Sequence, residues 1–430
     1  MPLNPSNTLA ALKELYTGDD FMKDLVYAKN PFLALVPKDE SPDGMAGKYI
    51  PVPIQWGNPT GRSATFATAQ TNENQARLSS FFVYRVQNYA VARIANELIE
   101  ATQGNAGAFV DAAKLAVDSS FRNLSNDLAL DLYGLGNGQR GAIGTGFTQD
   151  GTVAGGTRIP LSNVEQIVNF EVGMLLRASS TDGGSASDDT VTITNVNRST
   201  GVILGTASAA TLVGSWTAGG RLTQDGDISA TVASTATGAD DQTGFLKVTG
   251  LSGWLPSVDP TATTFCGVDR SQDSTRLAGV RFDGTGESVE EALIDGSTRV
   301  AREGGQPSMG FCSFATWAAL EKELGSKVQY VQVQHDNADI AFKGLTVNAP
   351  YGPITMLPDR NCTPRRIYLL SLDSWKLRSL GKAPHILTYG QEGLEALRVG
   401  TADSLEVRLG FYGNLVCSAP GWNAVISTAT

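Results

Sequence analysis

The sequence is poor in charged residues. Asp, Glu, Lys and Arg make up 18% of its 430 residues, against about 25% in an average soluble protein. Glycine is abundant, at 47 residues. This composition suits a chain whose surface is largely covered by other chains, and it also suits a β-rich protein. The formal charge of −10 argues against a protein that coats DNA by releasing its counterions.

Long apolar runs and targeting signals are also missing. No stretch approaches the ~20 continuous apolar residues of a membrane-spanning helix, and the N-terminal segment lacks the basic and apolar regions of a secretion signal. We therefore expect a chain that is made and used in the cytoplasm. Hydrophobic residues, at 41% of the chain, suffice to fill the cores of two or three domains.

Cysteine and histidine are scarce. The two histidines, His335 and His385, are far apart, and neither has a metal partner at helical spacing. No two cysteines form a C-x-x-C pair, which excludes that type of zinc or redox motif. We expect buried structural thiols at the four cysteines, which are Cys266, Cys312, Cys362 and Cys417.

Two other patterns resemble binding motifs only in part. Residues 136–141 fit G-x-G-x-x-G but follow a predicted helix rather than a strand, so they indicate a helix stop. Asp225 and Asp227 lack the rest of a calcium loop and are expected to be solvated loop acids, as are Asp240 and Asp241. We predict no catalytic residues, no cofactor and no metal site, and hence no enzyme.

Residues 1–47 form an arm that is too small to bury its own apolar side chains. Helical spacing predicts short helices at about 9–16 and 21–26. The prolines that follow predict an extended segment, whose apolar anchors are Phe32, Leu33, Leu35 and Val36.

Residues 48–94 form a long antiparallel ribbon. Its return strand is expected at about 81–94, and the polar stretch 57–80 is an unusually long loop. A two-stranded ribbon of this kind is only marginally stable in water unless it packs against another surface. The first strand, 48–56, has Pro51 and Pro53 on one face, which indicates an edge strand, and on the other face Ile50, Val52, Ile54 and Trp56.

A long helix is expected at 105–133, after a shorter one at 95–102. Its apolar residues step by three or four along one stripe, as in a helix laid across a sheet, and they are Phe109, Ala113, Val117, Phe121, Leu124, Leu128 and Leu132.

The second half of the chain changes character twice. Residues 163–250 are rich in Thr, Ser, Gly and Asp and predict a small β-barrel-like unit with a hairpin turn at 197–201. Beyond it, a capping box at 288–291 opens one helix and Ser313 another. Two or three antiparallel strands are expected in 394–426, and earlier strands at 328–333, 344–347, 354–357 and 367–370.

Several stretches, in this order along the chain, resemble the major capsid proteins of tailed double-stranded DNA phages. They are 15–21 with 29–32 (LYTGDDF and KNPF), 47–54 (GKYIPVPI), 351–360 (YGPI and LPDR) and 419–423 (APGWN). The resemblance implies an α+β fold of the Hong Kong 97 type. Its parts would be an N-arm (1–47), an E-loop ribbon (48–94), a peripheral domain with the spine helix (95–162), a β-rich insertion (163–250), an axial domain (251–389) and the return strands of the peripheral domain (390–430).

The family likeness also implies a function. The chain would self-assemble from pentamers and hexamers into the icosahedral head of a bacteriophage virion, after assembly in the host cytoplasm, and enclose double-stranded DNA without binding a particular sequence. Scaffolding, portal and decoration proteins would be further partners. The expected contacts between subunits are Phe32, Trp56, Arg62, Phe66 and Arg77 in the arm and ribbon, and Glu395, Arg398 and Asp403 in the loop that would meet its equivalents at local three-folds.

Two features qualify the family pattern. Some members link the E-loop to a neighbour through a lysine, but no Lys occurs between Lys48 and Lys114, so we expect a non-covalent shell. Some members carry a scaffolding segment before the arm, whereas this sequence enters the arm at once, so we expect a separate scaffolding protein or none. The alternatives are an encapsulin-like protein compartment and a β-rich surface-binding protein of the virion.

Overall fold

The structure is a computed structural model of the chain. It describes residues 30–41, 47, 49–95, 106–149, 156–180, 186–209, 211–212, 214–228, 245–260, 264–324, 330–335, 338–388, 396–399 and 403–429. The helices expected at 9–16 and 21–26 lie outside these residues, and so does the one expected at 95–102 apart from Ala95, which ends a strand. In these ranges, no helix has the length and hydropathy needed to cross a membrane.

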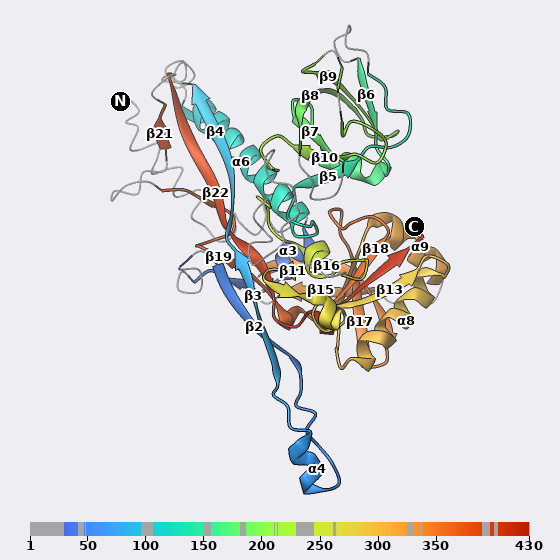
Figure 1. The fold of residues 1–430 in the computed structure, drawn as a ribbon. Coiled ribbons are helices and arrows are strands. Elements are labelled where there is room, and N and C mark those ends of the chain that lie inside the picture. Colours follow the sequence, from blue (N-terminus) through green and yellow to red (C-terminus); the bar gives the residue numbers. More distant parts are fainter. Residues whose placement is uncertain are drawn as a thin grey trace.

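Figure 1 shows four parts that meet near the middle of the molecule. A two-stranded ribbon projects away from the body, and a long sheet with its helix extends in the opposite direction. A β-rich unit and a sheet flanked by two helices form the remaining parts. The chain is thus extended along the ribbon and more compact elsewhere.

Helix α6 (Ala106–Asp131) lies along strand β4 (Val86–Ala95) and confirms the long helix expected at 105–133. The glycines beyond it, Gly136 and Gly138, have positive φ angles of 106° and 68°, which glycine adopts without strain. They confirm the helix stop. The buried residues of the apolar stripe, within the part whose side chains are described, are Val117, Phe121, Leu124, Leu128 and Leu132.

Strand β22 (Ser404–Cys417) is the centre of a six-stranded sheet. Strand β4 pairs antiparallel with it, so the return strand expected at 81–94 is divided between β3 (Arg77–Tyr84) and β4. At the division, Asn414 Nδ2 donates a hydrogen bond of 2.7 Å to the carbonyl oxygen of Tyr84. The other strands of the sheet are β1 (Lys38–Asp39), β19 (Trp375–Ser379), β20 (His385–Ile386) and β21 (Ala396–Arg398).

A seven-stranded sheet forms the helix-flanked part. Its last strand in the sequence, β23, pairs parallel with β13 and antiparallel with β18. The expectation that all of 390–430 returns to the sheet of α6 is therefore wrong for β23. In spatial order, the strands are β13 (Val280–Gly284), β23 (Ala424–Thr428), β18 (Arg366–Leu370), β14 (Met309–Cys312), β17 (Gly352–Pro358), β16 (Ala338–Ala349) and β15 (Tyr330–His335).

Both helices beside this sheet begin as expected. Helix α8 (Val289–Arg302) starts at a capping box in which Ser288 and Glu291 bond each other's backbone N–H groups. At helix α9 (Phe314–Leu324), the Ser313 hydroxyl accepts a hydrogen bond of 3.4 Å from the N–H of Thr316. Such caps satisfy N–H groups that have no partner within the helix.

The β-rich unit is a six-stranded antiparallel sheet that starts earlier than position 163. Its first strand, β5, lies before the expected boundary in the sequence but belongs to the unit, because it pairs with β10. The hairpin turn expected at 197–201 is confirmed, since Asn197 faces Val202 across it. In spatial order, the strands are β5 (Gln139–Ala142), β10 (Arg221–Gln224), β7 (Leu175–Ser179), β8 (Ala186–Asn197), β9 (Val202–Ala207) and β6 (Thr157–Pro160).

The arm differs most from expectation. Pro31–Leu35 is a short helix, α3, rather than an extended segment, because Pro31 occupies its first turn, where its missing N–H costs nothing. Phe32 is fully buried, with its ring centroid 5.4 Å from that of Tyr133 and 5.1 Å from that of Phe311. Phe32, Leu33, Leu35 and Val36 are therefore buried against the body of their own chain, which agrees with an arm too small to bury them by itself but leaves them inaccessible to a neighbouring subunit.

The remaining elements include the first strand of the ribbon and the helix at its tip. They are α4 (Phe66–Thr71), α7 (Leu251–Trp254), β2 (Tyr49–Gly57), β11 (Thr264–Phe265), β12 (Val268–Asp269), and the single 3-10 turns η3 (Val164–Asn169), η4 (Arg270–Asp273), η6 (Leu372–Ser374) and η7 (Pro420–Trp422).

Candidate assembly surfaces and the buried ionic cluster

The ribbon of β2 and β3 has a buried face and an exposed face. Successive side chains of a strand point to opposite sides, and Ile50, Val52 and Ile54 are buried while Pro51 and Pro53 on the other side are exposed. The strands pair antiparallel, with Tyr49 opposite Tyr84 at one end and Gly57 opposite Arg77 at the other. The two faces expected for the first strand are confirmed.

The base of the ribbon is fixed to the body. The ring of Phe81 contacts that of Trp254 edge to face at 5.2 Å, and the N–H of Phe82 donates a hydrogen bond of 2.8 Å to the carbonyl of Cys266. Gly267 follows with φ of +82°, and a Cβ there would lie 2.8 Å from the Phe82 ring. Close approach of backbone and ring therefore requires glycine at this position.

The tip of the ribbon leaves the body entirely (Figure 1). It carries α4, none of whose residues is buried. The N–H of Thr60 donates a hydrogen bond of 2.6 Å to the Asn74 side chain, which closes the two arms of the tip. A Cβ at Gly61 would lie 2.7 Å from the Glu73 backbone, so this closure needs glycine too. The loop expected at 57–80 is thus an ordered tip with a helix.

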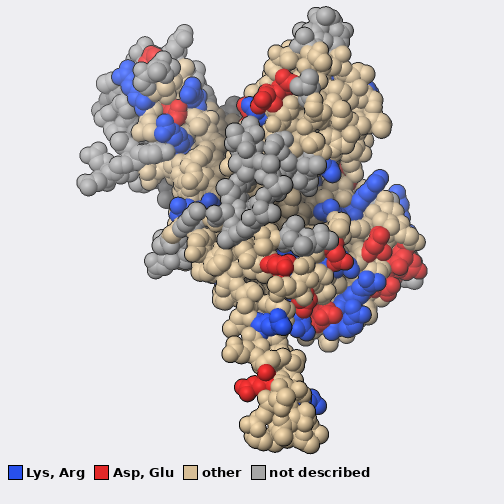
Figure 2. Space-filling model, in the orientation of Figure 1, with Lys and Arg blue, Asp and Glu red and all other residues tan. Residues whose placement is uncertain are grey.

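Apolar side chains are exposed at this tip. Phe66 is 78% exposed and Leu78 is 70% exposed. Figure 2 shows few charged side chains there, and most of the tip surface is uncharged. An exposed apolar surface on a projecting element indicates a contact with another molecule.

The structure brings two of the expected ribbon contacts together. Trp56 is half-buried, its Nε1–H donates to the Ser79 hydroxyl at 3.0 Å, and the Arg77 guanidinium lies 5.4 Å from its ring centre. Arg62 and Phe66 are exposed on the tip itself. Trp56 and Arg77 thus already contact each other in one subunit, which leaves part of each surface accessible.

The loop near the end of the chain is described in part. Glu395 lies outside the described residues. Arg398 Nη2 lies 3.9 Å from Asp403 Oδ1, and both side chains are more than two thirds exposed. The two residues therefore form a loose pair within one subunit.

A buried ionic cluster was missed by the sequence analysis. It joins α6 to the β-rich unit and contains three carboxylates and two cations. Lys247 Nζ lies 2.5 Å from Asp127 Oδ2, 3.0 Å from Asp227 Oδ1 and 3.7 Å from Asp131 Oδ2. Arg140 pairs with Asp127 and lies 3.6 Å from Asp227. All five side chains are at most 13% exposed.

The cluster has three carboxylates for two cations, and the pKa values of Asp127 and Asp131 shift in opposite directions. Burial raises the pKa of Asp131 well above its usual value, and repulsion from Asp127 and Asp227 acts in the same direction, against the attraction of Lys247. Burial acts on Asp127 in the same direction, but attraction to Arg140 and Lys247 prevails and lowers its pKa. The cluster therefore favours one proton at Asp131 beside an ionised Asp127.

The expectation of a solvated loop acid is wrong for Asp227. Its carboxylate is buried between Arg140 and Lys247, because buried cations need a counter-charge. One signal was available in the sequence: Asp127 and Asp131 lie four residues apart beside the apolar stripe of the long helix. Carboxylates on the buried side of a helix require partners elsewhere in the chain.

The remaining polar motifs show no catalytic arrangement. All four cysteines are free and buried, which confirms the structural thiols. In the described part of the chain, no group of three or more His, Cys, Asp or Glu side chains could hold a metal ion. His385 Nδ1 lies 2.6 Å from the carbonyl oxygen of Lys382, in an ordinary backbone contact.

Part of the chain is similar to a described family. Residues 224–395 match the family model described as the SU10 major capsid protein. None of the curated proteins matches the sequence.

The chain is also similar to several solved structures. A chain of the cyanophage A-1(L) capsid asymmetric unit is similar with a TM-score of 0.51 and 13% identity over 96% of each chain. A capsid of a native GTA particle is similar with a TM-score of 0.43 and 8% identity, over 93% of this chain and 90% of that chain. A structure of Mycobacterium phage Ogopogo is similar with a TM-score of 0.39 and 10% identity, over 94% of this chain and 92% of that chain. The cyanophage subunit establishes the fold.

Proposed function

We infer that this chain is a major capsid protein, a structural subunit that associates with copies of itself into a shell. The observation that carries this conclusion is the match of residues 224–395 to a major capsid protein family. The fold shared with the cyanophage capsid subunit over 96% of both chains agrees with it. The chain is not an enzyme, and the two alternatives, a protein compartment and a surface-binding protein, are not favoured.

The ribbon supplies the main contact between subunits in this proposal. Its base is rigidly packed, while its tip exposes Phe66 and Leu78 and buries no residue of α4. A two-stranded ribbon gains stability when it lies on another surface, and each Å² of apolar surface buried contributes about 25 cal/mol. The tip therefore lies over a neighbouring subunit, where Arg62 and the exposed part of Trp56 and Arg77 add contacts.

The loop of Arg398 and Asp403 provides a second, weaker contact. Both side chains are exposed and their distance of 3.9 Å is long for an ion pair, so exchange of partners between subunits costs little. Together with Glu395 they form ion pairs at local three-folds. An exposed pair contributes about 0–1 kcal/mol, but every subunit of the shell repeats it.

The finer assignments extend the same proposal. The fold is of the Hong Kong 97 type, with α6 as the spine helix and the seven-stranded sheet as the axial domain. Pentamers and hexamers form an icosahedral virion head around double-stranded DNA, assembled in the host cytoplasm. The β-rich unit braces neighbouring subunits on the outer surface, and scaffolding, portal and decoration proteins are further partners.

The shell is held together without covalent links. No Lys occurs between Lys48 and Lys114, so the ribbon tip has no amine for an isopeptide bond. A denaturing gel of purified particles tests this point. A single band at 45.3 kDa is expected, and a ladder of linked subunits would contradict it.

Assembly of tip variants tests the function itself. The wild-type chain should form shells visible by electron microscopy, whereas Phe66→Asp should remain as folded subunits in sedimentation velocity. Val258→Asp is the matched control, because Val258 is 75% exposed and belongs to the segment between α7 and β11 rather than to the ribbon. Shells of normal yield from Phe66→Asp, or loss of shells in both variants alike, would contradict the role of the ribbon.

A further inference from the structure

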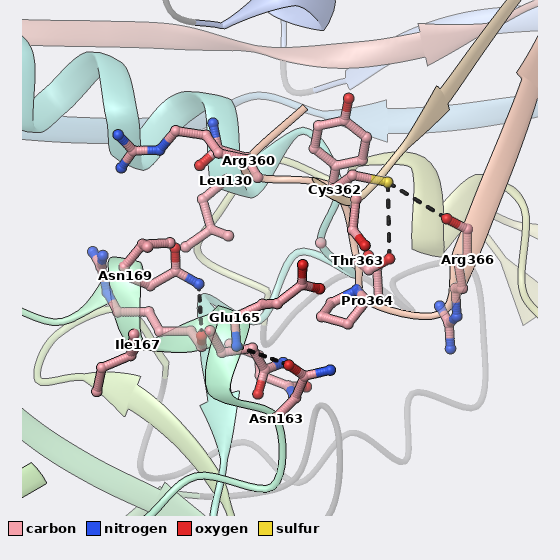
Figure 3. A pocket seen from close by; sticks show the side chains of 18 of the residues that line it. Leu130, Asn163, Glu165, Ile167, Asn169, Arg360, Cys362, Thr363, Pro364 and Arg366 are labelled. Atoms are coloured by element: carbon pink, nitrogen blue, oxygen red, sulfur yellow. Dashed lines mark hydrogen bonds between the residues drawn. The ribbon is translucent and has the colours of Figure 1, made fainter. Parts of the chain in front are cut away.

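A large cleft lies where three parts of the fold meet. Its volume is about 870 Å³, and its walls are the end of α6, the turn η3 with the residues before it, and the loop 360–366 before β18. Figure 3 shows Asn163, Glu165 and Asn169 on one side of the cleft and Cys362 to Arg366 on another. None of the assembly contacts described above lies in this cleft.

The cleft is strongly basic although the chain is acidic. Its lining includes six arginines and one glutamate, with no Lys, His or Asp, in a chain of formal charge −10. In Figure 2, blue side chains lie along the notch between the β-rich unit and the helix-flanked sheet. The carboxylate of the glutamate, Glu165, already accepts a hydrogen bond of 2.8 Å from the N–H of Ala315. The arginines are Arg140, Arg198, Arg221, Arg360, Arg365 and Arg366.

Three of these arginines are held by the protein. Arg140 belongs to the buried ionic cluster, and Arg198 Nη2 lies 2.9 Å from Glu171 Oε1. Arg366 donates hydrogen bonds to the hydroxyls of Ser252 and Ser257, at 3.2 and 3.0 Å. These contacts hold the three guanidinium groups in place, and the carboxylates beside Arg140 and Arg198 offset the positive charge of those two.

The other three have no ion pair with any described residue. They are Arg221, Arg360 and Arg365. Arg360 Nε is buried and has no hydrogen-bond partner in the described part of the structure. An unsatisfied buried donor costs about 1–3 kcal/mol, and an anion in the cleft recovers this cost if the Arg360 side chain turns this N–H towards it.

The backbone at Arg365 also indicates a functional position. Its φ angle is +59°, which is uncommon for a residue other than glycine. The carbonyl oxygen of Arg365 accepts a hydrogen bond of 3.0 Å from the N–H of Thr428, at the end of β23. The structure thus maintains a strained conformation beside the cleft, as is typical of binding sites.

We propose that this cleft binds adjacent phosphate groups, supplied by a nucleic-acid strand or by free polyphosphate. Guanidinium groups match phosphate oxygens with two parallel hydrogen bonds. Side-chain amides in the lining, among them Asn163, Asn169 and Asn361, add neutral donors, a combination common at phosphate backbones. A row of phosphates carries a charge on every group, which suits three arginines without ion pairs better than a single carboxylate does.

The test is direct binding to the unassembled subunit, so that its failure does not depend on shell formation. The probe is a fluorescent single-stranded oligothymidylate, followed by anisotropy over a series of salt concentrations. The triple variant Arg221→Gln/Arg360→Gln/Arg365→Gln should bind at least about tenfold more weakly. Its log–log salt slope should fall by about 2, because each lost phosphate contact removes about 0.7.

A charge-matched variant separates the cleft from general electrostatics. Arg122→Gln/Arg158→Gln/Arg302→Gln removes the same charge from arginines outside the cleft lining and should keep the wild-type slope. Replacement of the three cleft arginines by lysine should restore part of the affinity, which keeps the test valid if the glutamine variant fails to fold. Equal weakening in both glutamine variants would overturn the proposal.

Competition identifies the source of the phosphates. Displacement of the probe by inorganic tripolyphosphate at a lower concentration than by unlabelled oligothymidylate of equal charge indicates free polyphosphate, and the reverse order indicates a nucleic-acid strand. Either result supports the phosphate site. No binding of either probe to the wild-type subunit, or tighter binding of polyglutamate, would overturn it, the latter in favour of an acidic protein partner.

Discussion

The carboxylate of Glu165 accepts a hydrogen bond of 2.8 Å from the backbone N–H of Ala315. Glu165 belongs to η3 of the β-rich unit, and Ala315 to the first turn of α9 beside the seven-stranded sheet. A carboxylate at a helix N-terminus satisfies an unpaired N–H and opposes the positive end of the helix dipole. This contact and the buried ionic cluster together fix the β-rich unit to the rest of the subunit.

Removal of this contact should loosen the joint locally. Glu165→Ala is expected to cost about 1 kcal/mol, the usual value for the loss of a capping side chain, and to speed hydrogen exchange at the Ala315 amide. Glu171→Ala is the control, because Glu171 pairs only with Arg198 at the surface among described residues. Unchanged exchange at Ala315 in the Glu165 variant would show that the contact does not hold the joint.

Phe32 should act through the stability of the subunit. Phe32→Ala empties a fully buried site beside Tyr133 and Phe311, which typically costs about 3–5 kcal/mol. Phe66→Ala, at the exposed tip, should leave the unfolding midpoint in denaturant unchanged. Equal midpoints for Phe32→Ala and wild type would place the Phe32 ring outside the core.

The ionic cluster should respond to loss of its lysine. Lys247→Met leaves Asp127, Asp131 and Asp227 with Arg140 as their remaining cation in the cluster, and loss of one partner of a buried pair costs about 3–5 kcal/mol. The double variant Lys247→Met/Asp131→Asn removes one negative charge as well and should recover part of this loss. A double-mutant cycle from denaturant unfolding measures the coupling, and strictly additive effects would contradict the cluster.

The same cluster predicts a pH dependence of stability. The pKa of Asp131 is raised by burial, so the folded state holds its proton more tightly than the unfolded chain. Its contribution to stability is complete below about pH 4, the unfolded pKa, and is lost as the pH rises towards the folded pKa.

Asp131→Asn cannot ionise and should therefore gain stability relative to wild type as the pH rises. Denaturant unfolding at about pH 5, 7 and 9 measures this difference, with Asp295→Asn, an exposed site, as the control. Asp127 acts in the opposite sense: its pKa is lowered, so its contribution is lost in acid as the pH falls below about 4. A difference between Asp131→Asn and wild type that does not change with pH would contradict the raised pKa.

The four thiols should be unreactive in the native protein. All are free and buried, and burial raises the pKa of Cys417 to about 12, so little thiolate is present at neutral pH. A thiol titration should detect none before unfolding and all four afterwards. Rapid labelling of a folded subunit would contradict the packing of at least one cysteine.

Local patterns predicted the elements that their own residues determine. The stripe from Val117 to Leu132 predicted α6, and Ser288 with Glu291 predicted the start of α8, because partners three or four residues apart decide both features. The alternation of Ile50, Val52 and Ile54 with prolines likewise predicted β2 and its two faces.

Features that depend on distant partners could not be predicted in this way. Phe32 of the arm is buried because its ring contacts those of Tyr133 and Phe311, and β23 joins the seven-stranded sheet because Ala424 pairs with Val280. No local pattern encodes either pairing. Of the expected subunit contacts, Phe32 is fully buried within its own subunit. The others stay predictions, namely Trp56, Arg62, Phe66, Arg77, Glu395, Arg398 and Asp403.

Electron cryomicroscopy of assembled particles tests the central claim most directly. In a map of the shell, α4 of each subunit should lie on a neighbouring subunit, with the side chains of Phe66 and Leu78 buried between the two. A tip that remains in solvent or folds back on its own subunit in the particle would contradict the account.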